Sequence, residues 1–450
     1  MEASTFTRPE RGAELDLRID ALAYGGNGIA RIEGYVVFVS GAIPGDLVRA
    51  VVTKRKRAYA EARTLEVLEP SPEQIAPLAD HPGAPWQVLP YERQLAVKHE
   101  QVRDALTRIG RLEGFQLDDI VPAVAQWRYR NKLEYSFGTA ADGTLICGFH
   151  APGSWHDIVP VTDCLLASER SNRAREQVLA WCREQGLEAF DRRTHTGLLR
   201  NLIVREGRRT GQLQVRLVTG PGDIDGPSLA TAVDCEGLSR TTTDALAETT
   251  QGGETIKLAG NRTLEEELCG LSFSIAPNAF FQTNTEMADQ LYAIVAELAD
   301  LQGWERVYDL YCGIGTVGLS LAARAGEIWG LEIVEQAVAN AISNAKRNGI
   351  HNARFFAGDV RLALRELVDE ASRPDVCVID PPRAGLSQKV VRRIIEAAPR
   401  RIVYISCNPT TLAPNAAQLV ESGYALKRVV PVDMFAQTPH IECVALLERA

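Results

Sequence analysis

The stretch VYDLYCGIGTVGLSLA, residues 307–322, decides the fold of the C-terminal part of this chain. An apolar run typical of a buried strand ends near Asp309, a turn with Gly313 and Gly315 follows, and a helical pattern begins after the turn. Glycines in such a turn let the backbone approach a ligand closely. The stretch therefore predicts a strand–turn–helix unit with a ligand site at the end of the strand.

The same alternation of strand and helix continues from about residue 274 to residue 450. Apolar runs such as EIWGLEIV and DVCVIDPPR alternate with amphipathic runs such as EQAVANAISNAKRNG. Strands that are apolar throughout and separated by helices indicate a sheet that is covered on both faces. We therefore predict an α/β fold for residues 274–450, a doubly wound Rossmann-like domain.

The ligand of the glycine turn is predicted to be an adenosine derivative without phosphates. Glu332 ends the next predicted strand, where an acid binds ribose hydroxyls in doubly wound folds. The turn lacks the three-glycine spacing of a pyrophosphate binder and also a phosphate-binding lysine. S-adenosylmethionine fits these features best, and a glycine turn beside a solvated acid is the alternative.

Three further acids follow or enter predicted strands of the same domain. Asp359 ends the run FFAGD, where it either reaches the adenine or caps the next helix, and both interpretations stay open. Asp380 is followed by two prolines, which fix a loop at the carboxyl end of a strand. Glu442 enters the final strand, IECVALLER, where burial raises a carboxyl pKa and suits the group to proton transfer.

A cysteine ends another predicted strand, in YISCNPTTLAPN, residues 404–415. The ordinary alternative is a core cysteine, since free cysteine is among the most buried residue types. Cys407 opens onto the same sheet edge as Asp380, however, and a thiol, a carboxylate and a methyl donor together fit one reaction. Cys407 adds to carbon 6 of a uracil, carbon 5 takes the methyl, and Glu442 removes the carbon 5 proton so that the thiol leaves.

The N-terminal part has a different pattern. Residues 1–68 form short alternating runs between glycine-rich turns, which is typical of a small β-barrel. The basic run 54–57 with Tyr59 suits RNA binding, although a solvated hairpin has the same pattern. Residues 69–273 combine antiparallel strands with a helix and predict an α+β central domain, which we expect to share RNA binding with the barrel. A helix at about 92–110 is a candidate to pack on the C-terminal domain.

Composition limits the function classes. The chain is 45% hydrophobic and 24% charged, as in ordinary globular proteins. No apolar run reaches the ~18 residues of a membrane span, and the N-terminus lacks the apolar segment of a signal peptide, so we expect a cytoplasmic protein without a membrane partner. Nine cysteines without a C-x-x-C pair argue against disulfides and ribbon-type zinc. The net charge of −9 argues against indiscriminate coating of nucleic acid but permits a local basic surface.

Five sequence elements occur in a fixed order between residues 278 and 447: NAFFQTN, DLYCGIGTVGL, DPPRAGL, SCNPTTLAPN and DMFAQTPHIECVALL. In these elements the chain resembles the S-adenosylmethionine-dependent RNA uridine-5-methyltransferases. Its first 68 residues resemble a TRAM domain, an RNA-binding barrel of the OB type. YRNKLEYSF and LLRNLIVR resemble family elements of the central domain.

The resemblance assigns roles to individual residues. It implies that Cys407 is the nucleophile and Glu442 the base. The residues that it implies as S-adenosylmethionine contacts lie in the segment before the Rossmann-like unit and at its sheet edge: Gln282, Tyr311, Gly313, Glu332, Asp359 and Asp380.

One departure from the family concerns an iron–sulfur cluster. Many relatives bind a four-iron, four-sulfur cluster through three cysteines after the barrel and a fourth in the central domain. Here Ala76, His81 and Ala84 stand near the expected places, and only Cys164 is left. One thiol cannot hold a cubane cluster, so we expect no cluster, no metal ligand and a core position for Cys164. A metal held by His81 and Cys164 is the minor alternative.

A methyl group reaches carbon 5 only when the uracil leaves the base stack, which predicts a flipped loop nucleotide. The TRAM resemblance favours 23S ribosomal RNA as the substrate, transfer RNA is second, and a monomer suffices. Methyltransferases of small molecules or amides need no nucleophilic cysteine, and RNA cytosine-5-methyltransferases usually carry a Pro-Cys signature that VIDPP lacks. A non-catalytic RNA-binding protein that keeps the fold is the alternative outside enzymes.

Overall fold

The barrel is the first unit of the computed structural model, which describes residues 7–154, 156–245, 250 and 252–449. Its sheet has the strand order β1-β5-β6-β4-β3-β2 and curves around buried side chains such as Val37, Val39 and Val48. The predicted small barrel is confirmed, and residues 1–6 of its predicted range lie outside the described part. The strands are β1 (Glu14–Arg18), β2 (Ala21–Leu22), β3 (Gly28–Ile32), β4 (Tyr35–Ser40), β5 (Leu47–Arg55) and β6 (Tyr59–Glu69).

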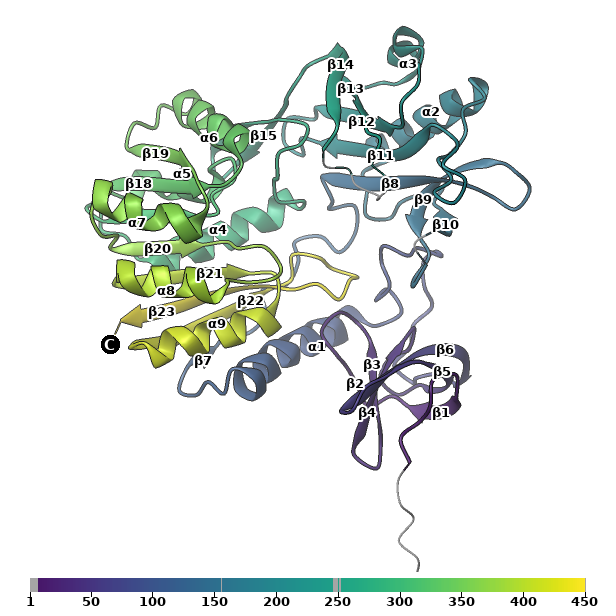
Figure 1. Ribbon diagram of the computed structural model, residues 1–450, viewed down its shortest axis with the longest axis horizontal. Helices are drawn as coiled ribbons and strands as arrows, with labels where there is room; N and C mark the ends of the chain where they lie inside the picture. The colour runs from purple at the N-terminus through teal and green to yellow at the C-terminus, as the bar shows by residue number, and fades with distance from the viewer. Residues whose placement is uncertain (1–6, 155, 246–249, 251, 450) are drawn as a thin grey trace, which may run out of the picture.

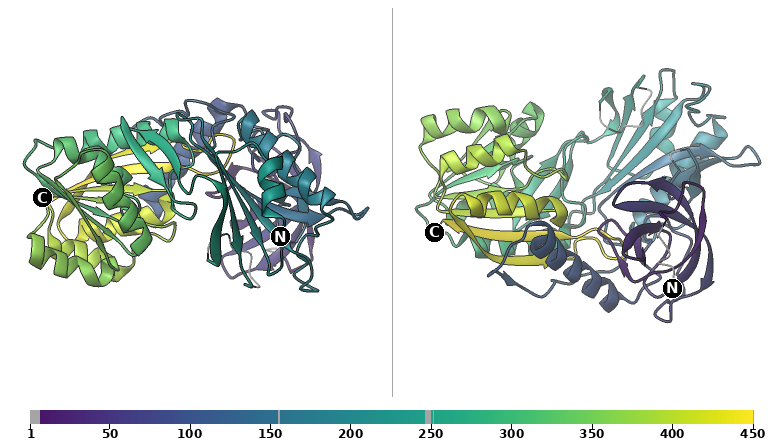
Figure 2. Two further views of the ribbon diagram at one scale, coloured as in Figure 1. Left: turned by 90° about the horizontal axis from the view of Figure 1, so that it is seen from above. Right: turned by 60° about the horizontal axis from the view of Figure 1, so that its bottom comes forward.

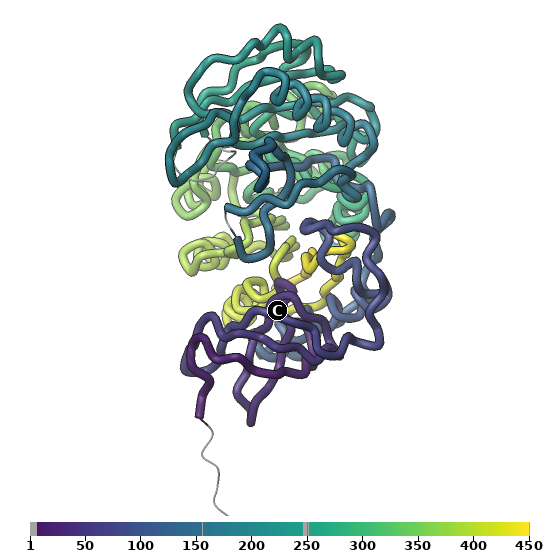
Figure 3. The backbone as a smooth tube through the Cα atoms, turned by 90° about the vertical axis from the view of Figure 1, so that its right-hand side faces the viewer, coloured from purple at the N-terminus to yellow at the C-terminus, as the bar shows by residue number. Residues whose placement is uncertain are grey.

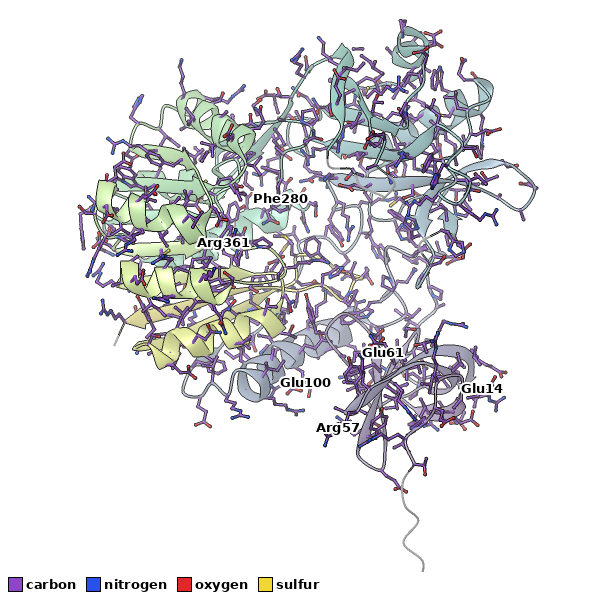
Figure 4. The ribbon with its side chains drawn as sticks, viewed as in Figure 1. Glu14, Arg57, Glu61, Glu100, Phe280 and Arg361 are labelled. Carbon is purple, nitrogen blue, oxygen red and sulfur yellow. The ribbon has the colours of Figure 1, made fainter. Side chains whose placement is uncertain are left out.

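The basic run 54–57 ends β5 and enters the turn that leads to β6, which pairs antiparallel with β5. The ammonium of Lys54 lies 2.9 Å from a carboxylate oxygen of Glu61, and both side chains are exposed. Arg55, Lys56 and Arg57 line an open hollow with residues 7–8. The tip of this hairpin is therefore a basic surface, with Arg57 on the outside of the barrel (Figure 4).

A helix and a short strand then join the barrel to the C-terminal domain. Helix α1 (Tyr91–Asp104) continues as a π-helix (Ala105–Ile109), and strand β7 (Gln116–Leu117) follows. The apolar side of this helix packs on α9 (Pro409–Glu421), and β7 pairs parallel with β22 (Tyr424–Val432). The helix predicted at about 92–110 thus lies against the C-terminal domain, although it precedes the central domain in sequence.

The central domain is built on a seven-stranded sheet with the order β10-β9-β8-β11-β12-β13-β14. All neighbouring strands are antiparallel except β12 and β13, which are parallel because α3 lies between them in the chain. Helices α2 (Glu169–Glu184) and α3 (Gly226–Ala232) cover one face. The strands are β8 (Lys132–Thr139), β9 (Leu145–His150), β10 (Ile158–Pro160), β11 (Leu199–Glu206), β12 (Leu213–Thr219), β13 (Gly237–Thr242) and β14 (Glu254–Gly260).

The hairpin β15 (Leu264–Leu268) and β16 (Leu271–Ile275) follows the central sheet. Its apolar side chains pack with α4 (Thr285–Ala299) and α6 (Glu335–Arg347) in the core of the C-terminal domain. The predicted boundary at residue 273 stays a prediction, since this hairpin packs with the domain that follows it.

The C-terminal domain has an eight-stranded sheet with the order β19-β18-β17-β20-β21-β23-β22-β7. Among the strands that the structure describes in this sheet, β23 alone runs antiparallel to both of its neighbours. The strand order reverses between β17 and β20, as expected for a doubly wound sheet, so the predicted fold class is confirmed. The remaining strands are β17 (Arg306–Leu310), β18 (Glu327–Glu332), β19 (Ala353–Ala357), β20 (Val376–Ile379), β21 (Arg401–Ser406) and β23 (Glu442–Arg449).

Helices cover both faces of this sheet. Side chains of α4, α6 and α5 (Thr316–Leu321) with the following 3₁₀ turn (Ala322–Arg324) share one core, and side chains of α1, α9, α7 (Val360–Ala371) and α8 (Gln388–Ala397) share the other. Within the described ranges, no helix is long and apolar enough to cross a membrane.

The three units are arranged around one end of the C-terminal domain (Figure 1). The central domain and the barrel both lie on the side where the segment before β23 projects, and α1 runs from the C-terminal domain to the barrel (Figures 1 and 3). The central sheet faces the C-terminal domain, with α2 on its far side (Figure 2). The carboxyl edge of the Rossmann-like sheet is therefore the place where residues from all three units meet.

Candidate active site

The glycine turn after β17 holds the carboxylate of Glu332 at the end of β18. The backbone N–H of Gly313 donates to one oxygen at 3.1 Å, and the N–H of Val334 donates to the other at 2.9 Å. Gly313 has a φ of +54°, and no atom lies within 4 Å of the place where its Cβ would be. The turn therefore leaves open space beside an oriented acid, as the sequence predicts for an adenosine site.

Tyr311 enters the same turn with a φ of +64°, a left-handed conformation that costs free energy for a residue with a side chain. Its N–H donates to the carbonyl of Leu331, which fixes the backbone there. Burial raises the pKa of the Tyr311 phenol to about 12, and Asp359 adds to the effect. Strained backbone of this kind is concentrated at functional sites.

Two acids lie next to this turn, the buried Asp309 of β17 and the partly buried Asp380, whose N–H donates to the carbonyl of Leu310. Burial raises the pKa of Asp309 to about 7 and the pKa of Asp380 to about 7. One oxygen of Asp309 accepts from the N–H of Gly318 at 2.8 Å, and within the described residues the other oxygen has no partner. A Cβ at Gly318 would lie 2.8 Å from the Asp309 carboxylate, so only glycine leaves room for it.

Cys407 and Glu442 lie next to each other at the end of the antiparallel pair β21 and β23. Ser406 pairs with Cys443 in this ladder, so the next residue along β21 faces the preceding residue of β23. Glu442 is only 5% exposed, and Cys407 is partly buried. The two residues that the sequence singled out on separate strands are thus neighbours in space.

Electrostatics couple this pair. Burial raises the pKa of the Cys407 thiol to about 11, with Glu442 as the next cause. Burial also raises the pKa of Glu442 well above its ordinary value, and Asp380 adds to it. Arg383 acts in the opposite direction on both groups. This arginine follows the two prolines after Asp380, and the sequence analysis did not single it out.

The remaining predicted cofactor residues have different surroundings. Gln282 is 7% exposed, and its backbone carbonyl accepts from the side chain of Asn131 at 2.8 Å. Asp359 caps α7, since its carboxylate accepts from the N–H of Arg361 at 2.9 Å and also binds the Arg361 guanidinium. That arginine holds the pKa of Asp359 below its usual value. The capping interpretation of Asp359 is therefore confirmed, whereas a contact with an adenine stays a prediction.

The segment 433–441, which carries Glu442 at its end, is clamped by residues that the sequence did not connect with it. The ammonium of Lys98 lies 2.6 Å from Asp433, both side chains are fully buried, and the Tyr91 hydroxyl donates to the other oxygen at 2.8 Å. The Gln94 amide donates to the Gln437 side chain at 2.7 Å. All three partners lie on α1, so this helix fixes the approach to Glu442.

The segment after the barrel does not fit a cubane cluster. The sequence holds no cysteine before Cys147, so residues 69–91 supply no thiolate. His81 and Cys164 do meet, with Nε2 and Sγ 3.2 Å apart, and both are buried, as is Ala84. Burial lowers the pKa of His81 and raises that of Cys164. Across the described ranges, no group of three His, Cys, Asp or Glu residues stands in a metal-binding arrangement.

Comparison with known proteins agrees with this geometry. The model of the family described as tRNA (Uracil-5-)-methyltransferase matches residues 262–450, and the TRAM domain model matches residues 8–65. An uncharacterised RNA methyltransferase of Gloeobacter violaceus is 39% identical over 98% of this chain and 97% of its own length. One of Halalkalibacterium halodurans is 34% identical over 96% of each chain.

A solved structure also matches over nearly the whole chain. It is the tRNA (uracil-54, C5)-methyltransferase of Pyrococcus abyssi in complex with S-adenosyl-L-homocysteine. It has a TM-score of 0.78 and 27% identity, and the match covers 96% of this chain and 100% of that one. The chain therefore belongs to the tRNA (uracil-5-)-methyltransferase family of RNA methyltransferases, and it is an enzyme of that class that carries an N-terminal TRAM domain.

Proposed function

We propose that this enzyme transfers a methyl group from S-adenosylmethionine to carbon 5 of one uridine in RNA, with Cys407 as nucleophile and Glu442 as base. The observation that carries the proposal is the pairing of Ser406 with Cys443, which brings the Cys407 thiol and the Glu442 carboxyl together. A thiol and a carboxyl at the carboxyl edge of a doubly wound sheet, beside a glycine turn and an oriented acid, are the groups that this reaction needs.

The first step belongs to Cys407. Its thiolate forms a bond to carbon 6 of the uracil, and the electron pair of the 5,6 double bond makes carbon 5 nucleophilic. Arg383 lowers the pKa of Cys407 and favours the thiolate, whereas burial and Glu442 oppose it. Since the thiolate is the reactive form, Arg383 is the residue that we expect to promote this step.

S-adenosylmethionine, when bound, supplies an electrophilic methyl group. The residues that fit it are the glycine turn with its open space at Gly313, the oriented Glu332, the buried Asp309 and the partly buried Asp380. We propose that Glu332 accepts hydrogen bonds from the ribose and that Gln282 and Tyr311 contact the amino acid and adenosine parts. Asp359, which caps α7, is also proposed as a contact of the adenine.

The last step belongs to Glu442. Once carbon 5 carries both a methyl group and a hydrogen, the carboxylate removes the hydrogen as a proton, the double bond reforms, and the Cys407–carbon 6 bond breaks. A carboxyl with a raised pKa is a stronger base when it is ionised than an ordinary glutamate. Removal of this base therefore leaves the enzyme attached to its RNA.

Surfaces near the carboxyl edge of the C-terminal sheet offer aromatic and basic side chains for RNA binding. Phe280, two residues before Gln282, is 67% exposed between the central and C-terminal domains and offers a ring to a base (Figure 4). Arg361, Lys389, Arg392 and Arg393 line a groove of about 410 Å³ between α7 and α8. Together with the basic tip of the barrel, these residues offer positive charge to phosphates although the chain is acidic overall.

The proposed RNA is 23S ribosomal RNA, on the ground of the TRAM domain. Transfer RNA is the second candidate, because the solved Pyrococcus abyssi enzyme that matches this chain acts on transfer RNA. The experiment uses total RNA from cells lacking this gene, purified enzyme and methyl-labelled S-adenosylmethionine, followed by mass-spectrometric mapping. Label on carbon 5 of one ribosomal uridine, absent with Cys407→Ala, is the expected result. Label confined to transfer RNA would keep the proposed reaction but make transfer RNA its substrate. The absence of label from all RNA would contradict the proposed reaction.

A further inference from the structure

The segment 433–441 is held more firmly than Glu442 requires. Glu442 itself is already placed by the sheet, since it pairs with Val432 of β22. The segment projects toward the other two units and is bound from several elements besides α1 (Figure 1). The Asn284 amide donates to one of its backbone carbonyls at 3.0 Å, and the Tyr129 hydroxyl donates to another at 2.8 Å. A further group in this segment is therefore held in a fixed position.

The turn inside this segment orients His440. Gln437 has a φ of +65°, a left-handed conformation that costs free energy for a residue with a side chain. The Thr438 hydroxyl donates to the carbonyl of Phe435 at 2.7 Å, and it accepts from the backbone N–H of His440 at 3.3 Å. The imidazole meets the Phe435 ring edge to face, with centroids 6.1 Å apart. Backbone strain, two hydrogen bonds and a ring contact thus fix one imidazole.

His440 lies on the same side of the chain as Glu442. Ile441 and Cys443 both pack into the core that contains α8 and α9, so the alternation of β23 begins before the strand itself. Alternate residues point to opposite sides, which places His440 and Glu442 together on the other side, about 7 Å apart along the chain. Cys407 faces Glu442 across the antiparallel pair. The three groups therefore follow one another in the order Cys407, Glu442, His440.

The imidazole is neutral at physiological pH. Burial lowers the pKa of His440 to about 4. Three cations add to this effect, and they come from three different parts of the chain: Arg383, Arg130 and Lys98. Arg383 also acts on the pKa values of Cys407 and Glu442, so its charge lies near all three groups. A neutral imidazole carries one N–H donor and one acceptor nitrogen.

The ring nitrogens of His440 are available to a ligand. Within the residues that the structure describes, neither nitrogen has a hydrogen-bond partner. The side chain is partly exposed, so a ligand can reach it. His99 is different, because its Nε2 lies 3.1 Å from the backbone carbonyl of Asp118. A polar group that the fold orients and leaves unpaired needs an explanation, and a substrate contact provides one.

The order of the three groups matches the order of atoms in a uracil. Carbon 6, which Cys407 attacks, is bonded to carbon 5, where Glu442 removes the proton, and carbon 5 is bonded to carbon 4, which carries O4. When the thiolate forms its bond to carbon 6, the electron pair of the 5,6 double bond moves between carbons 5 and 4. The pair of the carbonyl bond then moves onto O4. Negative charge thus develops next to carbon 5, on the side away from Cys407.

We propose that His440 is a further catalytic residue, whose N–H donates a hydrogen bond to O4 of the flipped uracil while the enolate forms. No proton is transferred, and O4 regains its double bond when carbon 5 takes the methyl group. A neutral imidazole can polarise a carbonyl in this way, and a donor aimed at developing charge lowers the barrier. The proposal rests on the proposed function, because it assigns a residue to that reaction.

The first test measures methyl transfer by variants of His440. His440→Ala should lower kcat by about 10²- to 10³-fold and leave the KM for S-adenosylmethionine and the unfolding temperature close to wild type. His440→Asn and His440→Gln place an amide N–H near the two ring nitrogens, and one of them should recover at least about tenfold of this loss. Wild-type kcat in His440→Ala, or kcat values for both amides no higher than for alanine, would overturn the proposal.

His351→Ala is the control for removal of a histidine. His351 is exposed and precedes β19, at the edge of the sheet opposite the site, so this variant should turn over as the wild type does. A loss of kcat in the control as large as in His440→Ala would overturn a specific role for His440.

Replacement of O4 tests the contact itself. Substrate RNA is assembled with either uridine or 4-thiouridine at the methylated position, and the ratio of the two rates is compared between enzymes. Sulfur accepts hydrogen bonds weakly, so the ratio should be about three- to tenfold larger for wild type than for His440→Ala. The different intrinsic reactivities of the two bases cancel in this comparison. Equal ratios together with a lowered kcat would show a purely structural role and overturn the proposal.

Adduct formation separates the step of His440 from that of Glu442. In Glu442→Gln the covalent adduct of Cys407 with RNA accumulates, and its rate of appearance reports the first step. The double variant His440→Ala, Glu442→Gln should form this adduct about 10²-fold more slowly. An adduct that accumulates in His440→Ala alone would place His440 at proton removal and overturn the proposal. Failure of the wild-type enzyme to label RNA appears before any variant is made and concerns the proposed function alone.

Discussion

The hydroxyl of Tyr24 donates a 2.7 Å hydrogen bond to the backbone carbonyl of Cys407. Tyr24 lies in the turn between β2 and β3 of the barrel, whereas Cys407 follows β21 of the C-terminal domain. Two residues further on, Gly26 has a φ of +91°, and a Cβ there would lie 3.1 Å from Pro439 in the segment before Glu442. One turn of the barrel therefore contacts both segments that carry the proposed catalytic pair.

We expect Tyr24→Phe to lower kcat about two- to tenfold, because one hydrogen bond that holds the backbone at Cys407 is lost. The KM for S-adenosylmethionine should not change. Tyr35→Phe is the matched control, since the Tyr35 hydroxyl also donates to a carbonyl, that of Lys56, but within the barrel. Equal kcat values for Tyr24→Phe and wild type would show that the barrel does not position the nucleophile.

Glu442→Gln should trap the enzyme on its RNA. Without the base, the carbon 5 proton stays, so the Cys407–carbon 6 bond does not break, and turnover falls by about 10²- to 10⁴-fold. Denaturing gel electrophoresis should show a protein–RNA adduct that carries labelled methyl. Glu448→Gln, at the far end of β23, is the control and should turn over normally. An adduct that still forms in the double variant Cys407→Ala, Glu442→Gln would contradict the assignment of Cys407 as the nucleophile.

Stability should decline as pH rises through neutrality. Burial raises the pKa of Asp309 from 3.8 to about 7, so between these values the folded protein binds a proton that the unfolded chain has lost. This contribution is present in full at low pH and disappears as pH rises through 7. Asp380 shifts in the same direction. Thermal unfolding between pH 5 and 8 should show a smaller decline for Asp309→Asn than for wild type, and parallel curves would contradict the shift.

The buried pair of Lys98 and Asp433 offers a test of the clamp on the segment before Glu442. Lys98→Met leaves the Asp433 carboxylate buried without its cation, which should cost about 3–5 kcal/mol of unfolding free energy. Arg93→Met, which breaks the exposed pair with Glu73 on the same helix, should cost at most about 1 kcal/mol. Denaturant unfolding measures both, and equal costs would show that burial of the first pair has no energetic weight.

The contact between His81 and Cys164 leads to a prediction about metal. Anaerobic treatment with iron and sulfide should add no cluster absorption band, and a chelator should leave the unfolding temperature unchanged, because the segment after the barrel supplies no thiolate. His81→Ala should still lower the unfolding temperature, since it leaves a buried space and a thiol without its neighbour. A cluster absorption band, or a lower unfolding temperature in the presence of the chelator, would show that a metal binds at His81 and Cys164.

The doubly wound fold could be predicted from sequence because each strand of the C-terminal domain shows its own pattern. The glycine turn, Glu332 and the acid before two prolines all lie at the ends of strands that are apolar throughout, and the doubly wound rule then gathers them at one edge. Asp359 shows the limit of this reasoning. Its position fits both a ligand contact and a helix cap, and the cap follows from the fold, where the backbone N–H and the side chain of Arg361 both bind its carboxylate.

Other parts of the site depend on contacts between distant segments. The insertion of β23 between β21 and β22 places Glu442 beside Cys407, and no periodicity in the chain encodes that order. Tyr24 and Lys98 belong to segments whose own patterns describe a barrel turn and an amphipathic helix. Lys98 shows a local signal, because a lysine on the apolar side of a helix needs an acid, but the sequence does not say which acid.

The strand β7 at the edge of the Rossmann-like sheet has a consequence for synthesis. Residues 91–117 leave the ribosome early, whereas their partners β22 and α9 are made near the end of the chain. At translation rates of about 5–20 residues per second, the interval is on the order of tens of seconds. During that time the apolar side chains of Val102, Leu106 and Leu112 have no docking surface and are exposed to chaperones. The nascent chain thus completes its barrel and central domain first, and the helix between them docks only when the last strands arrive.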